Sequence, residues 1–459
     1  MRSVVIPLFL LLLAAGGLRA QSGLTLQATP DREFYVARAR YTAYLELRVG
    51  APPAAAATGD DPPVRNVVLV LDRSGSMAGA PLEALRAAVT TAVNQLRPRD
   101  ILALVWFGSE VETTLEARRR DLVENFTAAL GTAEPAGGAA LYDALNQGAA
   151  QLRRHAGPAT SNHLVLLTDG APTKGPREAA DFASLAEAFA REQITISTIG
   201  LGPDFNEDLL TNLARTGHGR FHYAPTPADI ASALQAELAP VGAVVARDVV
   251  LTAEFDRDCT KLESFGWAPA VIKDQTATYR FPCILAGQNL TILLGADMES
   301  RRTSYRLARV RLSWTGVADG EAHTLEATPQ VMVEPDTEVS RRTVSVPVAR
   351  TLAGAVISDG LQQAIEQIDK GDMRRALREL RSARSELLDL NFYIDDPQIQ
   401  ASIGQFDNYL AEVQSRGLKA ADRKVLRSGV FHRFETPVPG NKPELAREDR
   451  YRSSSSYPK

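Results

Sequence analysis

The chain has 459 residues, of which 45% are hydrophobic and 23% are charged, and its formal net charge is -4 with a pI near 6.0. This length exceeds that of one ordinary domain, and the composition is that of a soluble globular protein. Because no overall positive field exists to attract phosphates, the charge argues against nucleic acid as the main partner.

The first twenty residues have the pattern of a secretory signal. Arg2 precedes an almost wholly apolar run over 4–15, and Ala20 supplies a small residue for cleavage. The pattern predicts a signal peptide over residues 1–20 and an exported protein, either periplasmic or secreted. A membrane anchor is the alternative, but the run is shorter than the roughly 20 residues that span a bilayer. No later segment approaches that length, so we expect no transmembrane segment.

Residues 21–63 predict strands followed by a linker. Segments 24–27 and 44–49 have strand character, and the second alternates apolar and polar residues. The stretch over 51–63 is rich in Ala and Pro, which is typical of a linker.

Residues 64–240 predict an α/β domain. Short apolar strands are expected at 67–71, 101–107, 163–168, 194–199 and 221–223, and helices at about 81–95, 177–191, 206–214 and 227–238. Continuous apolar strands are typical of a sheet that is covered on both faces. Their alternation with helices predicts a doubly wound parallel sheet.

Residues 241–338 predict antiparallel β structure, as a sheet or a sandwich. Alternating strands such as 276–281 and 305–312 occur without any helix signal. The strands before residue 50 have no helical partners of their own. We therefore expect them to join this β domain, with the α/β domain inserted between the two parts.

The only two cysteines of the chain, Cys259 and Cys283, lie in this β region. An exported protein meets an oxidising environment, so we predict a disulfide between them. Such a bond would contribute about 3 kcal/mol in the chain-entropy description. Two buried thiols are the alternative, and two cysteines are too few for a structural zinc site.

Residues 345–423 predict a helical module for packing or docking. Two helices over 348–390 are joined at 370–372, and a third is expected at 397–415. Residues 424–459 are polar, with a run of four serines at 453–456, and predict a disordered tail.

A cluster of oxygen-bearing side chains follows two of the expected parallel strands. Asp72 ends the first strand, Ser74 and Ser76 follow it on a turn that Gly75 allows, and Asp169 ends a second strand. Ligands of a doubly wound sheet bind at this carboxyl edge. Two carboxylates with hydroxyls suit Mg²⁺, with Ca²⁺ or Mn²⁺ as alternatives, and disfavour zinc because no soft ligand is near.

The sequence Asp72-Arg73-Ser74-Gly75-Ser76 resembles the Asp-x-Ser-x-Ser signature of the von Willebrand factor type A family's metal-ion-dependent adhesion site. Its surroundings are similar to those in secreted bacterial members and in inter-alpha-trypsin-inhibitor heavy chains. Thr168-Asp169-Gly170 resembles the third metal loop of the family. The resemblance covers about residues 65–240.

This resemblance implies a protein-binding function. A metal held by few protein charges keeps its Lewis acidity and accepts an Asp or Glu from a protein partner. Arg73, Met77, Thr173 and Lys174 are then expected at the rim of the partner site, or else are ordinary solvent-facing side chains. The oligomeric state stays open.

One loop departs from the family pattern. Residues 137–143 resemble the second metal loop, but Ala139 stands where the family usually has Thr. Ala has no oxygen to offer, so we expect weaker metal binding. The alternative is a metal-independent structural module of an envelope assembly that keeps the fold as a scaffold.

We expect no enzymatic activity. Ser74 is not in a Gly-x-Ser-x-Gly turn, because Asp72 occupies the place of the first Gly, and the chain has no His-Glu-x-x-His motif for a metal-assisted hydrolase. His218 and His222 would share one face of a strand and form a second metal pair. An ordinary strand after a turn is the simpler interpretation.

Overall fold

The structure is a computed structural model that describes residues 18–19, 23–53, 64–131, 133–157, 160–202, 204–238, 244–265, 271–299 and 301–416. The predicted tail lies outside these residues, as do the signal segment apart from Leu18 and Arg19 and most of the linker. Export therefore remains a prediction. Among the described residues, no helix combines the length and hydropathy that crossing a membrane requires.

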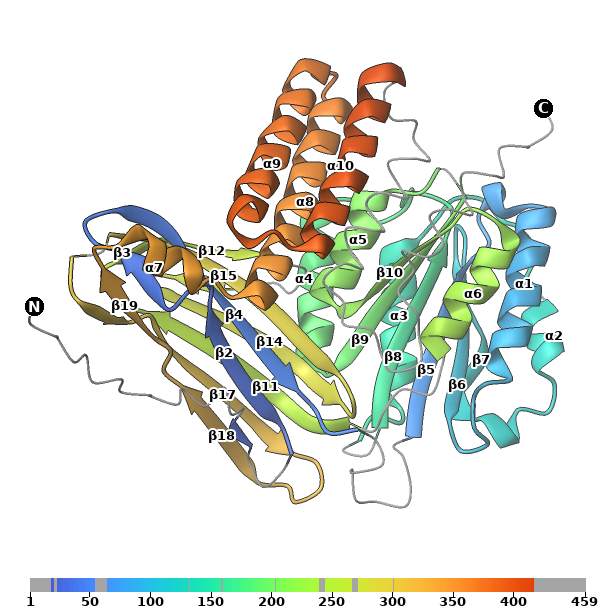
Figure 1. Ribbon diagram of the computed structural model, residues 1–459. Coiled ribbons are helices and arrows are strands. Elements are labelled where there is room, and N and C mark those ends of the chain that lie inside the picture. The colour runs from blue at the N-terminus through green and yellow to red at the C-terminus, as the bar shows by residue number, and fades with distance from the viewer. Residues whose placement is uncertain are drawn as a thin grey trace, which may run out of the picture.

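Three parts make up the fold, as Figure 1 shows: a β-sandwich, an α/β domain beside it and a bundle of three long helices above them. The α/β domain contains a sheet of six described strands in the order β10-β9-β8-β5-β6-β7. Five run parallel, and β7 at the edge is antiparallel to β6. The strand bounds are β5 (Val64–Asp72), β6 (Ile101–Phe107), β7 (Val111–Arg119), β8 (Thr160–Thr168), β9 (Ile194–Leu201) and β10 (His218–Ala224).

Helices cover both faces of this sheet because its central strands are apolar on both sides. Val68 and Val70 of β5 enter one core, whereas Val67, Leu69 and Leu71 enter the other, as the twofold repeat of a strand requires. The first core is closed by α3 (Leu141–Arg153), α4 (Ala179–Arg191) and α5 (Glu207–Thr216). The second is closed by α1 (Ala80–Val93), α2 (Phe126–Gly131) and α6 (Pro227–Leu238). The prediction of a doubly wound sheet is confirmed.

The sandwich has two five-stranded sheets around one core. The first has the order β1 (Leu18–Arg19), β2 (Thr25–Pro30), β4 (Arg40–Gly50), β15 (Asn289–Glu299) and β12 (Cys259–Phe265). The second has the order β13 (Val271–Lys273), β14 (Thr276–Leu285), β11 (Val244–Phe255), β17 (Ala308–Gly316) and β18 (Ala322–Ala327). Leu45 and Leu47 of the first sheet share the core with Leu251 and Tyr279 of the second. A small sheet of β16 (Ser304–Arg306), β19 (Gln330–Glu334) and β3 (Phe34–Val36) lies beside them.

The α/β domain is inserted into this sandwich. Strand β4, which precedes it in the chain, pairs with β15, which follows it, from Gly50 opposite Asn289 to Arg40 opposite Glu299. The strands before residue 50 thus join the later β domain, as the sequence predicts.

Arg65 joins the two ends of the insertion at the base of the parallel sheet. From the start of β5, its Nη1 donates to the backbone oxygen of Leu238, the last residue of α6, at 2.6 Å. Its Nε donates to the buried carboxylate of Asp100 at 2.7 Å, and its Nη2 to the oxygen of Gln95 at 2.8 Å. These charge-assisted bonds hold the entry and the exit of the inserted domain together.

The predicted disulfide is wrong. Cys259 lies on β12 of one sheet and Cys283 on β14 of the other, and both are free thiols. Burial raises the pKa of the Cys259 thiol to about 12 and that of Cys283 to about 11. Consecutive strands of a sandwich often pass to different sheets, so a short sequence separation did not place the two sulfur atoms together.

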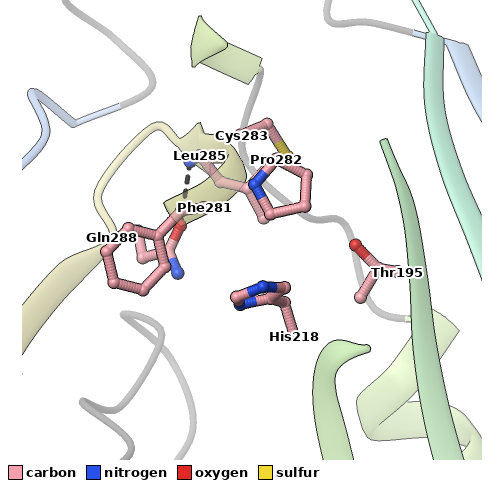
Figure 2. Close-up of a pocket in the computed structure, with 7 residues that line it drawn as sticks. All are labelled: Thr195, His218, Phe281, Pro282, Cys283, Leu285 and Gln288. Atoms are coloured by element: carbon pink, nitrogen blue, oxygen red, sulfur yellow. Dashed lines mark hydrogen bonds between the residues drawn. The ribbon is translucent and has the colours of Figure 1, made fainter. Parts of the chain in front are cut away.

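Cys283 instead lines a small pocket between the sandwich and the α/β domain. Figure 2 shows His218 of β10 pointing toward Phe281, Pro282 and Cys283 of β14. The rings of His218 and Phe281 meet edge to face, with centroids 5.7 Å apart. Nearby, Arg247 Nη2 donates to the backbone oxygen of Thr160 at 3.0 Å. The two domains are therefore packed against each other at this junction.

The helical bundle rests on the outer face of the sandwich. It consists of α8 (Val346–Asp369), α9 (Met373–Ile394) and α10 (Pro397–Arg416), preceded by the short α7 (Thr337–Arg342). Val348, Leu352 and Ala355 of α8 pack on Leu293 of β15. The predicted turn at 370–372 lies between α8 and α9, whereas α7 was not predicted.

A buried carboxylate stabilises the far edge of the parallel sheet. Glu237 of α6 lies 2.8 Å from Arg220 Nε and 2.6 Å from His222 Nε2, and its second oxygen lies 3.3 Å from His163 Nε2. Burial alone would raise the pKa of Glu237, but the Arg220 charge and hydrogen bonds from His163 and His222 hold it well below its ordinary value.

We expect Glu237→Gln to destabilise the fold at neutral pH by about 3 kcal/mol, because it removes the buried carboxylate that pairs with Arg220 and accepts a hydrogen bond from His222. A carboxyl with a depressed pKa stabilises the folded state above its unfolded pKa and loses that contribution as pH falls. The difference in unfolding free energy between variant and parent should therefore shrink below a pH of about 4.5, the ordinary pKa of a Glu carboxyl. Urea unfolding at several pH values measures it, with the exposed Glu187→Gln of α4 as control. Parallel stability curves for Glu237→Gln and parent would contradict the assignment.

Candidate functional site

The candidate site lies at the carboxyl edge of the parallel sheet. Asp72 is the last residue of β5 and Thr168 the last of the neighbouring β8. After Asp72 the chain enters a short 3-10 turn, η2 (Gly75–Met77), which leads into α1. Gly79 joins the two with a φ of 79°, a conformation that favours glycine.

Asp72 is fully buried and hydrogen-bonded on both oxygens. Its Oδ1 accepts from the backbone N–H of Ser74 at 2.7 Å, and its Oδ2 accepts from Thr168 Oγ1 at 2.5 Å. Thr168 was not among the predicted site residues, although it stands directly before Asp169. Hydrogen-bonding capacity alone does not distinguish it from other strand-end threonines.

The other three predicted ligands form a connected chain beside Asp72. Ser74 Oγ lies 3.1 Å from Ser76 Oγ, and Ser76 Oγ donates to Asp169 Oδ1 at 2.8 Å. The structure thus brings Asp72, Ser74, Ser76 and Asp169 to one corner of the sheet edge.

The two carboxylates of the site are held without a cationic partner. Burial raises the pKa of Asp72, against the hydrogen bonds from Thr168 and Ser74. Burial also raises the pKa of Asp169, and the charge of Asp72 adds to this effect. Within the described part of the chain, neither carboxylate forms an ion pair with Lys, Arg or His. Burying two charged carboxylates costs free energy, and a bound cation would offset much of that cost. The oxygen donors are those that hard divalent ions prefer.

The second loop is held in place by backbone groups. The N–H of Gly75 donates to the oxygen of Gly137 at 3.0 Å, and the N–H of Ala140 to the oxygen of Gly108 at 2.8 Å. Ala139 is 3% exposed, and its methyl group belongs to the adjacent core. Because alanine has no side-chain oxygen, position 139 offers no side-chain ligand.

Thr173 closes this loop from the other side. Its Oγ1 accepts from the N–H of Ala139 at 2.6 Å, and its own N–H donates to the oxygen of Ala139 at 3.0 Å. A Cβ at Gly138 would lie 2.3 Å from Thr173 Oγ1, which explains the glycine there. Thr173 was predicted at the rim, and it is exposed there while also joining two loops.

The remaining rim residues differ in their surroundings. Met77 is fully buried in the core beneath the site, so its prediction as a rim residue is wrong: the η2 turn directs it under the sheet edge. Arg73 is mostly covered and lies 2.9 Å from Glu112 Oε2. Lys174 is exposed, and its Nζ donates to the backbone oxygen of Ser109 at 3.0 Å. Glu112 lies on β7 and Ser109 follows β6, and neither belongs to the metal signature, so the sequence did not single them out.

The two histidines considered as a second metal pair have separate roles. His222 contacts Glu237, whereas His218 lies at the junction with the sandwich. Across the described ranges, no group of three or more His, Cys, Asp or Glu side chains is arranged to hold a metal ion. A metal at the Asp72 corner would therefore depend on hydroxyl oxygens beside two carboxylates.

Comparison with known proteins shows which domain family the α/β region resembles. Residues 65–223 match the family model of the von Willebrand factor type A domain. An uncharacterized protein of Synechocystis is 28% identical over 191 residues, which make up 41% of this chain and 44% of that protein. Inter-alpha-trypsin inhibitor heavy chain H1 of Bos taurus is 29% identical over 201 residues, which make up 41% of this chain and 22% of that one. Each match thus spans less than half of the relative.

A solved structure resembles nearly the whole chain. The structure described as von Willebrand factor type A from Catenulispora acidiphila has a TM-score of 0.68 and 19% sequence identity, and the match covers 92% of this chain and 99% of that one. At this identity the likeness shows the fold, including the parts outside the α/β domain. Together with the family match over residues 65–223, it establishes that this protein contains a von Willebrand factor type A domain.

Proposed function

We propose that this protein is a non-enzymatic binding protein that holds Mg²⁺ at the Asp72 corner and uses it to bind an Asp or Glu of a protein partner. The observation that carries the proposal is the convergence of Asp72, Ser74, Ser76 and Asp169, where no cationic side chain of the described ranges pairs with either carboxylate. A buried carboxylate without a partner is costly, and a divalent ion offsets that cost.

The donor set also suits a partner carboxylate. When bound, Mg²⁺ supplies a Lewis-acidic centre that is not neutralised by the few protein charges around it. The four side chains would hold it from the sheet side, and Thr173 and Lys174 of the loop bonded to Ala139 are exposed to a partner. We infer from the fold and from this chemistry that a protein ligand is oriented by the metal and selected by these loops.

The arrangement of the serines argues against nucleophilic catalysis. Ser74 and Ser76 hydrogen-bond to each other and to Asp169, and neither contacts a histidine among the described residues. A serine nucleophile requires an adjacent general base. The site therefore fits binding better than hydrolysis.

A metal-independent scaffold is the second candidate function, and Ala139 is the observation that favours it. Without an oxygen at position 139, the site loses a side-chain ligand while its loops keep their backbone contacts. Such a chain would retain the fold and bind its partner through other surfaces.

We expect Mg²⁺ to raise the melting temperature of the parent protein. At a hundredfold excess over the dissociation constant, binding to the folded state alone adds about 2.7 kcal/mol to the free energy of unfolding. Asp72→Asn should abolish this gain and also stabilise the metal-free protein, because it removes a buried charge that has no cation. Thermal melting with Mg²⁺ and with EDTA tests both points, with the exposed Asp181→Asn of α4 as control. An unchanged melting temperature of the parent in millimolar Mg²⁺ would favour the scaffold.

The missing oxygen at position 139 yields a gain-of-affinity test. Ala139→Ser restores a hydroxyl with little added volume, and Ala139→Thr restores the residue usual in the family. We expect Mg²⁺ binding to tighten by about tenfold, or about 1.4 kcal/mol, as measured by titration calorimetry. Ala139→Val matches the shape of Thr without its oxygen and should show no tightening. Equal affinities for all variants would place residue 139 outside the metal's surroundings.

Partner binding should depend on the metal. We expect an envelope extract to yield a protein that the immobilised chain captures in Mg²⁺ and releases in EDTA, because the metal–carboxylate bond carries the orientation. Asp72→Asn should lose this capture, whereas Asp181→Asn should keep it. Mass spectrometry of the eluates measures the difference. Capture that survives both EDTA and Asp72→Asn would refute the metal bridge.

A further inference from the structure

A histidine lies in the junction between the inserted α/β domain and the sandwich. His218 begins β10, the edge strand of the parallel sheet, and Figure 2 shows its ring between Thr195 of β9 and residues of β14. These residues line a cavity of about 80 Å³, to which β14 contributes Pro282 and Cys283. The edge-to-face contact of His218 with Phe281 joins the two domains across it. The imidazole is therefore part of the surface through which the domains pack.

This imidazole has no polar partner that would stabilise a positive charge. Nδ1 of His218 is buried and forms no hydrogen bond to the described residues. None of the described residues that line the cavity carries a carboxylate. Burial lowers the pKa of His218 from its ordinary value of 6.5 to about 4, because the charged form would lose its hydration. At neutral pH the ring is therefore uncharged and packs as an aromatic group.

The cationic and thiol groups around the cavity offer a proton on His218 no compensation. Cys283 is the other titratable group of the cavity lining, and burial raises the pKa of its thiol to about 11, so it is neutral. Arg247 of β11 stands opposite Cys283 in the ladder and is positively charged. Arg215 of α5 is also a cation, and it bonds to Asn212 of its own helix. A protonated imidazole would thus join positive charges.

The carboxylates of the neighbouring elements are directed elsewhere. Glu237 of α6 is bonded to Arg220 and His222. Asp248 of β11 accepts a hydrogen bond from Gln193 Nε2 at 3.1 Å. The remaining acidic residues of α5 and α6 lie in the first turns of those helices, away from the start of β10. The junction accommodates a neutral imidazole well and a charged one poorly.

The backbone at the junction is strained. His218 has a φ of 56°, Gln193 a φ of 61° and Asp248 a φ of 52°. They are three of the seven described non-glycine residues in the left-handed region. Such conformations persist only where the surrounding packing holds them, and they concentrate at functional and switch regions. Because Gln193 belongs to the α/β domain and Asp248 to the sandwich, separation of the domains would release this strain.

We propose that His218 is a pH-dependent switch that keeps the inserted domain packed against the sandwich when its imidazole is neutral and releases it when protonated. A cation cannot stay beside Phe281 and Cys283 without a counter-charge, so protonation favours the open junction. The domain would then stay attached through its two chain connections, with the β10 side free to move. The switch would set the orientation of the Asp72 corner relative to the sandwich.

The direction of the pH dependence follows from the two states. In the open junction the imidazole is in water and has the ordinary pKa of 6.5, whereas in the closed junction its pKa is about 4. Between these values the open state binds a proton that the closed state does not bind. Opening therefore becomes more favourable as the pH falls from 6.5 toward 4, and this group has no effect at higher pH.

The two cysteines allow a test in the full chain. Both are free thiols, but Cys283 lines the cavity at the junction whereas Cys259 belongs to the core of the sandwich. The protein is labelled in EDTA with 4,4′-dithiodipyridine, which reacts with thiols in mild acid, and mass spectrometry measures the rate at each cysteine relative to glutathione. We expect the relative rate at Cys283 to rise by about tenfold or more from about pH 7 to about pH 4.5, with Cys259 unchanged.

Two matched variants assign the effect to His218. His218→Asn cannot be protonated in this range and tolerates a positive φ, so labelling of Cys283 should no longer change with pH. His323→Asn changes a histidine on β18, at the other edge of the same sandwich sheet, and should keep the rise. Thermal melting at each pH confirms that the variants are folded, and His218→Gln replaces the Asn variant if that one does not fold.

Three outcomes would overturn the proposal. They are a Cys283 rate that does not rise in the parent, an equal rise at Cys259, which would indicate global unfolding, and a rise that persists in His218→Asn. Because labelling is done without metal, the result is independent of the proposed Mg²⁺ function.

Discussion

The desolvated carboxylate of Asp72 is the constraint around which the site is organised. A charge taken out of water at the end of a buried strand requires compensation from nearby dipoles or ions. The chain supplies part of it through the Ser74 N–H and the Thr168 hydroxyl, and both depend on a tight turn after β5 and on β8 ending alongside. Among the described residues no Lys, Arg or His side chain pairs with this carboxylate, and the proposed Mg²⁺ would supply the positive charge.

The loops around Asp72 are joined mainly through their backbones. The N–H of Ala136 donates to the oxygen of Arg73 at 2.8 Å, and the N–H of Ser109 donates to the oxygen of Ala136 at 3.2 Å. Such bonds do not depend on side-chain identity. The change of a threonine to Ala139 can therefore remove one oxygen from the site without loosening its frame.

The sequence was sufficient for the features that depend on periodicity. Apolar strands such as 67–71 and the unpartnered strands before residue 50 led to the doubly wound sheet and to its insertion into the β domain. Asp72, Ser74, Ser76 and Asp169 were placed together because parallel strands end at one edge.

Features that depend on where a turn directs a side chain could not be predicted from the sequence. Met77 follows the metal signature but turns into the core, and Cys259 and Cys283 lie on different sheets. Strand β7 and the one-and-a-half-turn helix α2 were missed because an edge strand and a helix of six residues give weak patterns. Helix α3 was missed although its apolar residues are spaced as regularly as those of α4.

The bond from Arg65 to Leu238 has a mechanical consequence. The inserted domain is attached to the sandwich at both of its ends, and these ends meet at the base of the sheet, opposite the Asp72 corner. A tensile force applied at that corner would run along β5, which lies between β6 and β8. The ladders on both sides would then be loaded in shear, with all their hydrogen bonds sharing the load. Because force reaches the sandwich through two covalent connections, the domain would resist being peeled away from one end.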